Sequence, residues 1–487
     1  MLKCDTLIRN AQVLDGSGNN AQLLDVAVYD GRILEIGASL HCSPTHITEA
    51  DGLSLAPGFI DVHTHDDTSV IETPAMLPKI SQGVTTVTTV IVGNCGISAS
   101  PVRLKADPPD PMNLLGKREY FRYPSFGDYV SALAAACPSV NVAVLIGHTS
   151  LRNNHMDRLD RTATSGEIES MRAEFAAALE TGALGLSSGL AYASANAAST
   201  DEVMALASTL IGLHGVYVTH MRTETNAILD AMDEAFRIGR SSESAVVISH
   251  LKCAGIANWG RSGEVLDALE RARTSQHIGC DCYPYAAGSS TLDLKQVDPR
   301  VKIEITWSTP FPAAAGRTLA DIAREWGLKQ LGAAKRLQPA GAIYHSINED
   351  DMRRILAHPA TMIGSDGLPW DQHPHPRLWG AFPRVLGRYC REIELFSLPQ
   401  AIHKMTTMPA RRFGLAQRGA IMENYWADLV LFNPDTIEDS ATFADPVRPA
   451  RGIKKVWVNG VLSYTSQGLT GNRAGRFLPR ARTEWLQ

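Results

Sequence analysis

Histidines at the ends of short apolar runs form a pattern typical of a metal centre. His63 and His65 make an H-x-H pair directly after FIDV, His220 follows VYVT, and His250 follows AVVIS. Alternate residues of a strand face the same side, so both members of the pair can point into one site. Imidazole is a common zinc ligand, and zinc also accepts sulfur and oxygen donors. The four histidines therefore predict a zinc site, with hydrogen-bonded polar histidines at the strand ends as the alternative.

Cys95 and Asp366 end two more runs and could complete that site. Cys95 lies in VGNCGIS, where its neighbours indicate a tight turn. Because a metal deprotonates a coordinating thiol, Cys95 is expected to bind zinc, with a core thiol or an activated nucleophile as alternatives. Asp366 follows TMIGS. A carboxylate beside activated water can accept its proton and pass it on, so Asp366 is the expected general base and acid as well as a metal ligand. A turn-forming aspartate is the alternative.

Two cations and a phenol lie just beyond these runs. Lys252 lies two residues after His250, Tyr283 follows IGCDC, and Arg377 lies in HPHPRLWG. Near a metal they could hold an anionic group of a substrate, and surface charge or core packing is the alternative.

Eight apolar runs in all, most separated by helix-like stretches, must position these residues. Parallel strands joined by crossover helices produce this alternation. The spacing predicts an α/β fold, a (β/α)8 TIM barrel over residues 58–414 with the site at the carboxyl ends of its strands. An open doubly wound sheet is the rival. The runs are FIDV, VTTVTTVIV, VAVLIG, ALGLSS, VYVT, AVVIS, IGCDC and TMIGS.

Both ends of the chain differ from this middle part. They consist of short β-rich runs with Asp-Gly turns and one Asn459-Gly460 pair, a strong hairpin signal. These runs predict one small β domain built from residues 1–57 and 415–480. A Pro- and Gly-rich stretch that begins near Ala286 interrupts the barrel rhythm. Loops of that length are usually lids or inserted subdomains.

Composition narrows the class of protein. The chain has 487 residues, 44% hydrophobic and 20% charged, with a net charge of −5. The sequence has no basic stripe that would indicate a nucleic-acid partner, and it has no apolar run long enough to span a membrane. Eight cysteines are too few for a disulfide scaffold, which favours a reducing cytoplasm. The oligomeric state is left open.

With these residues in hand, the chain resembles the D-aminoacylase (N-acyl-D-amino-acid deacylase) family of the amidohydrolase superfamily. The stretches that carry the resemblance include APGFIDVHTHDD, VGNCGIS, HMRTE, SHLKCAG, YPYAAGSST and GSDGLPWDQHPHPRLWG. It implies zinc-dependent hydrolysis of N-acyl-D-amino acids to a carboxylate and a free D-amino acid. It also implies a tight zinc site at Cys95, His220 and His250, a second, weaker site at His63, His65 and Asp366, a β-sandwich from both termini, and a mobile insertion at residues 286–345.

The same resemblance implies roles around the substrate. Lys252, Tyr283 and Arg377 would hold the α-carboxylate with help from Ser289, while Tyr192 and Tyr344 would line the side-chain pocket. In this family an arginine near position 295 would suggest an acidic substrate side chain, but this chain has Lys295. The resemblance therefore favours a hydrophobic or broad side-chain preference, and an N-acyl-D-glutamate or N-acyl-D-aspartate deacylase is the alternative. The further alternatives are a cyclic-amide hydrolase of the hydantoinase or dihydroorotase type and a non-catalytic metal-binding scaffold.

Overall fold

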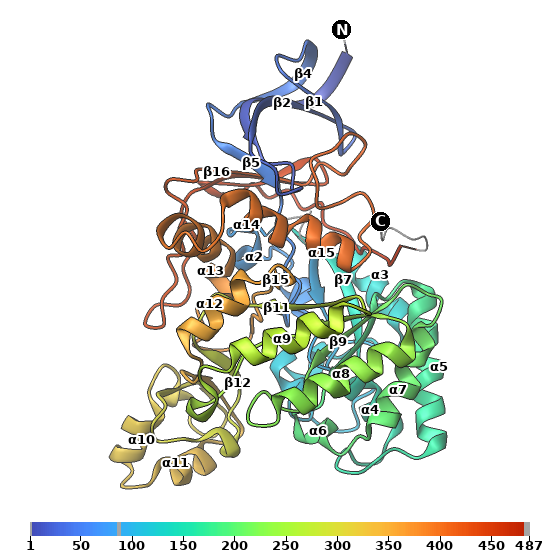
Figure 1. Cartoon of the computed structure of the whole chain (residues 1–487), viewed down its shortest axis with the longest axis vertical. Helices are drawn as coiled ribbons and strands as arrows, with labels where there is room; N and C mark the ends of the chain where they lie inside the picture. Colours follow the sequence, from blue (N-terminus) through green and yellow to red (C-terminus); the bar gives the residue numbers. More distant parts are fainter. Residues whose placement is uncertain (1, 85–88, 482–487) are drawn as a thin grey trace.

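A curled sheet of seven parallel strands forms the centre of the computed structural model, which describes residues 2–84 and 89–481. Its strands follow one another in chain order, as successive β-α units dictate (Figure 1). They are β6 (Thr89–Val92), β7 (Asn141–Gly147), β8 (Gly185–Gly189), β9 (Val216–His220), β10 (Ala245–Ile248), β11 (Ile278–Cys282) and β15 (Thr361–Ile363). These are the predicted second to eighth strands; residues 85–88 of the second lie outside the described residues.

The predicted first strand, residues 59–62, is present as isolated bridges rather than as a regular strand. Asp61 bridges Val90 within β6, and Thr64 bridges Gly367 after β15, both in parallel orientation. This segment therefore contacts both edges of the seven-stranded sheet, the position of an eighth strand.

The strands are buried on both faces, as expected for a parallel sheet covered by helices. Ala143 and Leu145 of β7 pack in an inner cluster with Ile60 and Val62, whereas the alternating Val144 packs in the outer cluster beneath the helices. The two-residue period of a strand separates the two clusters.

Helices α3 (Phe126–Ala136), α4 (His148–His155), α5 (Ser165–Thr181), α7 (Thr200–Ala207), α8 (Ile228–Ser242), α9 (Ser262–Arg273) and α12 (Glu349–Ala357) lie between the strands in sequence. In α5 the residue that caps the amino-terminal end is Thr164. The Thr164 hydroxyl accepts a hydrogen bond from the Glu167 amide, and Glu167 accepts one from the Thr164 amide. This reciprocal capping needs a hydroxyl three residues before the glutamate, so the cap is Thr164. The helix ends at Thr181, and Gly182 caps it with a φ of 111°.

A single nine-stranded sheet combines the two ends of the chain. Its strands are β1 (Leu2–Val13), β2 (Gln22–Tyr29), β3 (Arg32–Gly37), β4 (Cys42–Glu49), β5 (Ser54–Pro57), β16 (Leu429–Phe432), β17 (Ile453–Val458), β18 (Val461–Thr465) and β19 (Gly468–Leu469). β5 pairs with β16 in antiparallel orientation and joins the two halves. The predicted hairpin is confirmed: Asn459 and Gly460 connect β17 to β18 with φ of 46° and 81°, the left-handed values that a two-residue type I′ turn requires.

The stretch after β11 folds into a small unit with its own core. β12 (Gly288–Thr291), β14 (Ala340–Tyr344) and β13 (Ile303–Ser308) form a three-stranded antiparallel sheet, covered by α10 (Leu319–Glu325) and α11 (Gln330–Leu337). Ile305, Leu319 and Ala342 belong to its hydrophobic cluster. In Figure 1 this unit lies at the end of the molecule opposite the terminal sheet.

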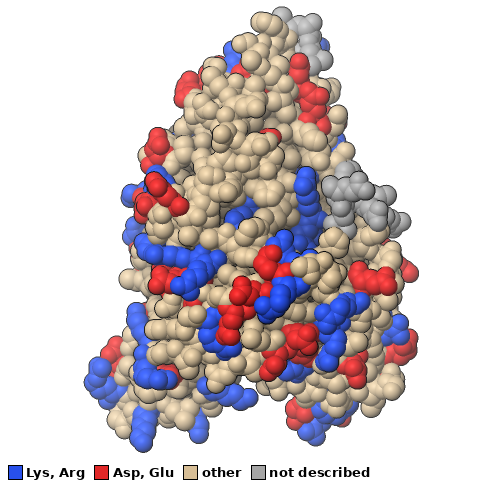
Figure 2. Space-filling model, viewed as in Figure 1, with Lys and Arg blue, Asp and Glu red and all other residues tan. Residues whose placement is uncertain are grey.

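The other helical segments are short. They are α1 (Ser69–Glu72), α2 (Leu77–Ile80), α6 (Ala193–Asn196), α13 (Arg377–Arg384), α14 (Leu398–Met405), α15 (Thr407–Arg412), the 3-10 turns η1 (Met112–Leu115), η2 (Arg118–Tyr120), η3 (Ser208–Leu210), η4 (Ile256–Asn258), η5 (Leu294–Gln296) and η6 (Pro312–Ala314), and the π-helical η7 (Val385–Glu392). Among the described residues, no helix has both the length and the apolar character needed to cross a bilayer. Charges of both signs are interspersed on the face shown in Figure 2.

Candidate metal centre and substrate cavity

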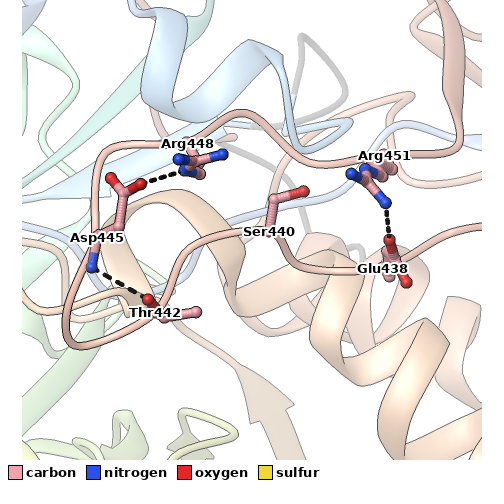
Figure 3. A pocket seen from close by; sticks show the side chains of 6 residues that line it. All are labelled: Glu438, Ser440, Thr442, Asp445, Arg448 and Arg451. Atoms are coloured by element: carbon pink, nitrogen blue, oxygen red, sulfur yellow. Dashed lines mark hydrogen bonds and ion pairs between the residues drawn. The ribbon is translucent and has the colours of Figure 1, made fainter.

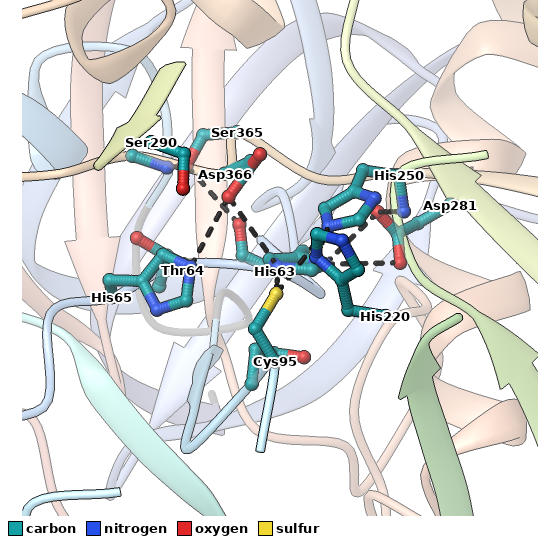
Figure 4. Close-up of polar contacts among 12 residues, drawn as sticks. His63, Thr64, His65, Cys95, His220, His250, Asp281, Ser290, Ser365 and Asp366 are labelled. Carbon is teal, nitrogen blue, oxygen red and sulfur yellow. Dashed lines mark hydrogen bonds and ion pairs between the residues drawn. The ribbon is translucent and has the colours of Figure 1, made fainter. Parts of the chain in front are cut away.

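Cys95 is the meeting point of one group of candidate ligands at the carboxyl ends of the strands (Figure 4). Its Sγ lies 3.2 Å from Nε2 of His63 and 3.4 Å from Nε2 of His250. His220 joins the group through its Nδ1, 3.0 Å from Nε2 of His250. Sulfur and nitrogen donors thus converge from the ends of three strands, β6, β9 and β10, and from the segment that contains His63.

Asp366 organises a second group beside the first. Its Oδ1 lies 3.3 Å from Nε2 of His65 and 3.6 Å from Nε2 of His63. His63 therefore contacts both Cys95 and Asp366 and links the two groups. All six predicted ligand residues lie in one cluster.

The backbone is strained at several of these positions. Cys95, His250 and Asp366 adopt positive φ of 53°, 34° and 50°. Non-glycine residues rarely occupy this region, and each such residue costs on the order of 1–3 kcal/mol. Strain of this kind clusters at functional sites. Here it accompanies the turns by which the chain leaves β6, β10 and β15.

The donor set fits a zinc ion. The groups His63–Cys95–His250 and His63–His65–Asp366 each bring three donor atoms within 4.8 Å of one another. Burial alone would raise the pKa of Cys95, but the charges of His63 and His250 lower it well below its ordinary value, which favours the thiolate that binds metal. Nδ1 of His65 is buried without a hydrogen-bond partner.

Burial alone would likewise raise the pKa of Asp366. The charge of Arg377 and a hydrogen bond with His65 instead hold that pKa well below its ordinary value. Asp366 is therefore anionic at neutral pH, the form that binds a cation or accepts a proton.

Two carboxylates that the sequence reasoning missed orient the histidines. Glu224 lies with Oε1 3.0 Å from Nδ1 of His250. Asp281 lies with Oδ1 3.3 Å from Nδ1 of His63, and the same oxygen accepts a hydrogen bond of 2.9 Å from the His250 amide. Carboxylates that hold the second ring nitrogen fix the orientation of metal-binding histidines. The available signals were the place of Glu224 four residues after His220 in HMRTE and of Asp281 near the end of IGCDC.

A cavity of about 910 Å³ opens directly onto the cluster. Its lining combines metal-site residues with most of the predicted substrate-binding residues, namely His65, His220, His250, Asp366, Tyr192, Lys252, Tyr283, Ser289 and Tyr344. The Lys252 ammonium lies 2.6 Å from Oε1 of Glu224 and 6.0 Å from the centre of the Tyr283 ring. The Tyr283 hydroxyl is buried without a hydrogen-bond partner, so it is free to donate to a bound ligand.

Arg377, also predicted to bind substrate, is not among the residues that line this cavity. Its side chain is 1% exposed, and Nη1 lies 2.9 Å from Oδ2 of Asp366. Nη2 donates a hydrogen bond of 2.9 Å to the Ser289 carbonyl, and the guanidinium stacks 4.6 Å from the centre of the Tyr283 ring. These contacts support Asp366 and β12 directly.

A second hollow lies far along the chain and carries none of these features (Figure 3). It encloses about 420 Å³ between Glu438 and Arg451. Its charges are already paired, since Arg451 lies 3.0 Å from Glu438 and Arg448 contacts Asp445. It offers no histidine or cysteine donor.

A parallel α/β sheet with histidine, cysteine and aspartate side chains converging at its strand ends defines a metal-dependent hydrolase of the amidohydrolase class. The amidohydrolase family model matches residues 47–464. Over 487 residues the chain is 45% identical to N-acyl-D-aspartate deacylase of Alcaligenes xylosoxydans xylosoxydans, covering 100% of this chain and 97% of that protein. It is 46% identical to D-aminoacylase of the same organism, covering 98% of each.

A solved structure agrees with these relatives. The chain is 42% identical to N-acyl-D-glutamate deacylase of Bordetella bronchiseptica complexed with zinc and a phosphonate inhibitor, a mimic of the tetrahedral intermediate of the reaction. The match covers 98% of this chain and 100% of that one, with a TM-score of 0.94. The chain belongs to the D-aminoacylase family of amidohydrolases, and the predicted family is confirmed.

Proposed function

We propose that the protein hydrolyses N-acyl-D-amino acids to a carboxylate and a free D-amino acid in a zinc-dependent reaction. The observation that carries this proposal is the convergence of Cys95, His63, His250 and Asp366 beside a cavity that His250, Asp366 and Lys252 line. The relatives named for this activity match nearly the whole chain. Three structural proposals accompany it: a closed (β/α)8 barrel over residues 58–414, a terminal β-sandwich domain from residues 1–57 and 415–480, and an insertion at 286–345 that closes over the cavity.

The proposed centre holds one zinc tightly at Cys95, His220 and His250 and a second more weakly at His63, His65 and Asp366. When bound, zinc polarises the substrate carbonyl and lowers the pKa of water from 15.7 toward about 7. Asp366 accepts the proton from the attacking water and returns it to the leaving nitrogen. Lys252 and Tyr283 hold the α-carboxylate, with Ser289 beside them. Arg377 holds Asp366 in position through the ion pair described above.

The side-chain pocket lies between Tyr192 and Tyr344 in this proposal, and its charge favours a neutral substrate side chain. Lys295 lines the cavity, but so do Asp110 and Asp293. These two acids line the same cavity as Lys295 and offset its charge. This supports a hydrophobic or broad preference over N-acyl-D-aspartate or N-acyl-D-glutamate.

A substrate panel tests the function and the preference together. Zinc-loaded protein is incubated with N-acetyl-D- and N-acetyl-L-amino acids carrying hydrophobic, glutamate and aspartate side chains, and the released primary amine is measured. We expect metal-dependent release from the D-substrates alone, fastest with hydrophobic side chains. Ring opening of hydantoins without release from the D-substrates would instead establish a cyclic-amide hydrolase. A protein that binds zinc and releases nothing from either class would be a metal-binding scaffold.

Lys252→Met tests the α-carboxylate site. A hydrogen bond to a charged group contributes about 1.5–3 kcal/mol, which is roughly 10- to 150-fold in kcat/KM. We expect a loss of this size on N-acetyl-D-methionine, mainly through KM. An N-acetyl amine without the carboxylate should react equally with both proteins. Lys295→Met, which removes the other lysine of the cavity, is the matched control, and an equal loss there would contradict the assignment.

A further inference from the structure

Lys79 is a fully buried lysine beside the metal-ligand cluster. It is 0% exposed and extends from the short helix α2. Its ammonium donates hydrogen bonds of 2.8 Å each to Oδ2 of Asp61, Oγ1 of Thr64 and Oγ of Ser365. An ammonium has three N–H donors, so these partners use all of them.

The partners of Lys79 lie within the two segments that carry His63, His65 and Asp366. Thr64 stands between the two histidines, and Ser365 directly precedes Asp366. The segments also meet through their backbones, since the Asp366 amide donates 2.7 Å to the His63 carbonyl and the His65 amide donates 3.1 Å to the Gly367 carbonyl. The ammonium therefore fastens together the two segments that carry the second ligand group.

Two carboxylates surround this lysine and extend the network. Asp61 accepts hydrogen bonds of 2.8 Å from the Ser365 amide and 2.6 Å from its hydroxyl. Asp66 lies 3.1 Å from the Lys79 ammonium and accepts a hydrogen bond of 2.6 Å from Thr64. Burying such a network removes each ion from water at a cost in stability, and apolar residues of similar size are often as stable. Stability alone therefore gives no reason for a lysine at this place.

The geometry points to Lys79 as a positioning residue that holds His63, His65 and Asp366 in the arrangement needed to bind the weaker metal. This inference rests on the metal centre of the proposed function. Among the described residues, Lys79 makes no contact with Cys95, His220 or His250, so the tighter site should depend on it less than the weaker one, and chiefly through His63, which contacts Cys95 at 3.2 Å. Removing a group that orients metal ligands typically weakens metal affinity 10- to 100-fold.

Lys79→Met and Ser365→Ala test this role by metal binding rather than turnover. The metal-free full-length protein is titrated with Co²⁺ and Zn²⁺ in competition with a chelator, and the thiolate-to-cobalt absorption band reports the Cys95 site. We expect the second equivalent to bind 10- to 100-fold more weakly in Lys79→Met. The affinity for the first equivalent should change by a clearly smaller factor, and the thiolate band should remain. Ser365→Ala should shift the second equivalent in the same direction by a smaller factor.

Lys404→Met is the matched control. Lys404 is a second buried lysine, 5% exposed, and its ammonium donates to the carbonyls of His358 and Thr361 at the opposite end of β15. Its loss should lower the melting temperature and leave both metal affinities as in the wild type. If Lys79→Met does not fold, Ser365→Ala carries the test.

The positioning role would be overturned if folded Lys79→Met bound both equivalents with wild-type affinity. Where Lys79→Met does not fold, the same result in Ser365→Ala would overturn it. An equal loss of both equivalents would do the same. A wild-type protein that binds no second equivalent would remove the weaker site and this inference together. Release of D-amino acid by the wild type tests the proposed reaction separately.

Discussion

Replacement of Asp366 by asparagine should lower kcat at least about 100-fold on the best D-substrate, because a general acid or base typically contributes 10²–10⁴-fold. The amide keeps the size of the carboxylate but cannot accept the proton of the attacking water. Asparagine also removes the negative partner of Arg377, 2.9 Å away. Turnover is measured at saturating substrate, with the zinc content and melting temperature of each preparation recorded beside it.

Asp371→Asn is the control for that variant. Asp371 lies in the same loop after β15 and belongs to neither of the two ligand groups. Burial raises the pKa of Asp371 to about 7, so an amide is close to its protonated form. We expect less than about a tenfold change in kcat, in line with a group outside proton transfer. Near-normal turnover by Asp366→Asn with both metals bound would rule out the proton-transfer role.

Replacement of Cys95 by alanine should have the other large effect. It removes the sulfur donor that lies between His63 and His250. Metal polarisation supplies several kcal/mol of transition-state stabilisation, which corresponds to roughly a thousandfold or more in rate. We expect loss of the first zinc equivalent by chelator competition and a fall in kcat/KM of that size, matched by dialysis of the wild type against a chelator.

Cys280→Ala is the matched control for the thiol. Cys280 is fully buried in β11 and contacts the Thr361 hydroxyl at 3.2 Å, away from the ligand groups. It should keep zinc and activity while losing some stability, because a cavity replaces the thiol. If Cys95→Ala retained tight zinc binding, the histidines would be sufficient ligands and the assignment of Cys95 would be wrong.

Much of this arrangement could be predicted from strand ends alone. In a parallel α/β fold all carboxyl ends face one side, so residues after FIDV, VYVT and AVVIS had to approach one another. The position of Cys95 and Asp366 in the same cluster followed from the same rule. The local turn at Asn459-Gly460 was equally readable, because only a few residues accept positive φ at both central positions.

What the sequence did not reveal depends on long-range contacts. Glu224 and Asp281 resemble ordinary polar residues until the fold places them 3.0 Å and 3.3 Å from histidine nitrogens. Lys79 reads as a surface lysine in LPKI, yet it is buried against residues that include Ser365, far along the chain. For Arg377 the sequence did not reveal the contacts with Asp366 and the Ser289 carbonyl, and its contact with substrate stays a prediction.

Because β5 pairs with β16, the terminal sheet can be completed only after the carboxyl-terminal strands have been synthesised. Pro57 pairs with Leu429 in this sheet, so the amino-terminal strands leave the ribosome long before their partners exist. At synthesis rates of about 5–20 residues per second, β5 keeps an open edge for a period on the order of tens of seconds. Nascent chains stalled before β16 should therefore be held by chaperones or degraded, and release of the carboxyl-terminal strands should be the event that makes the enzyme resistant to proteases.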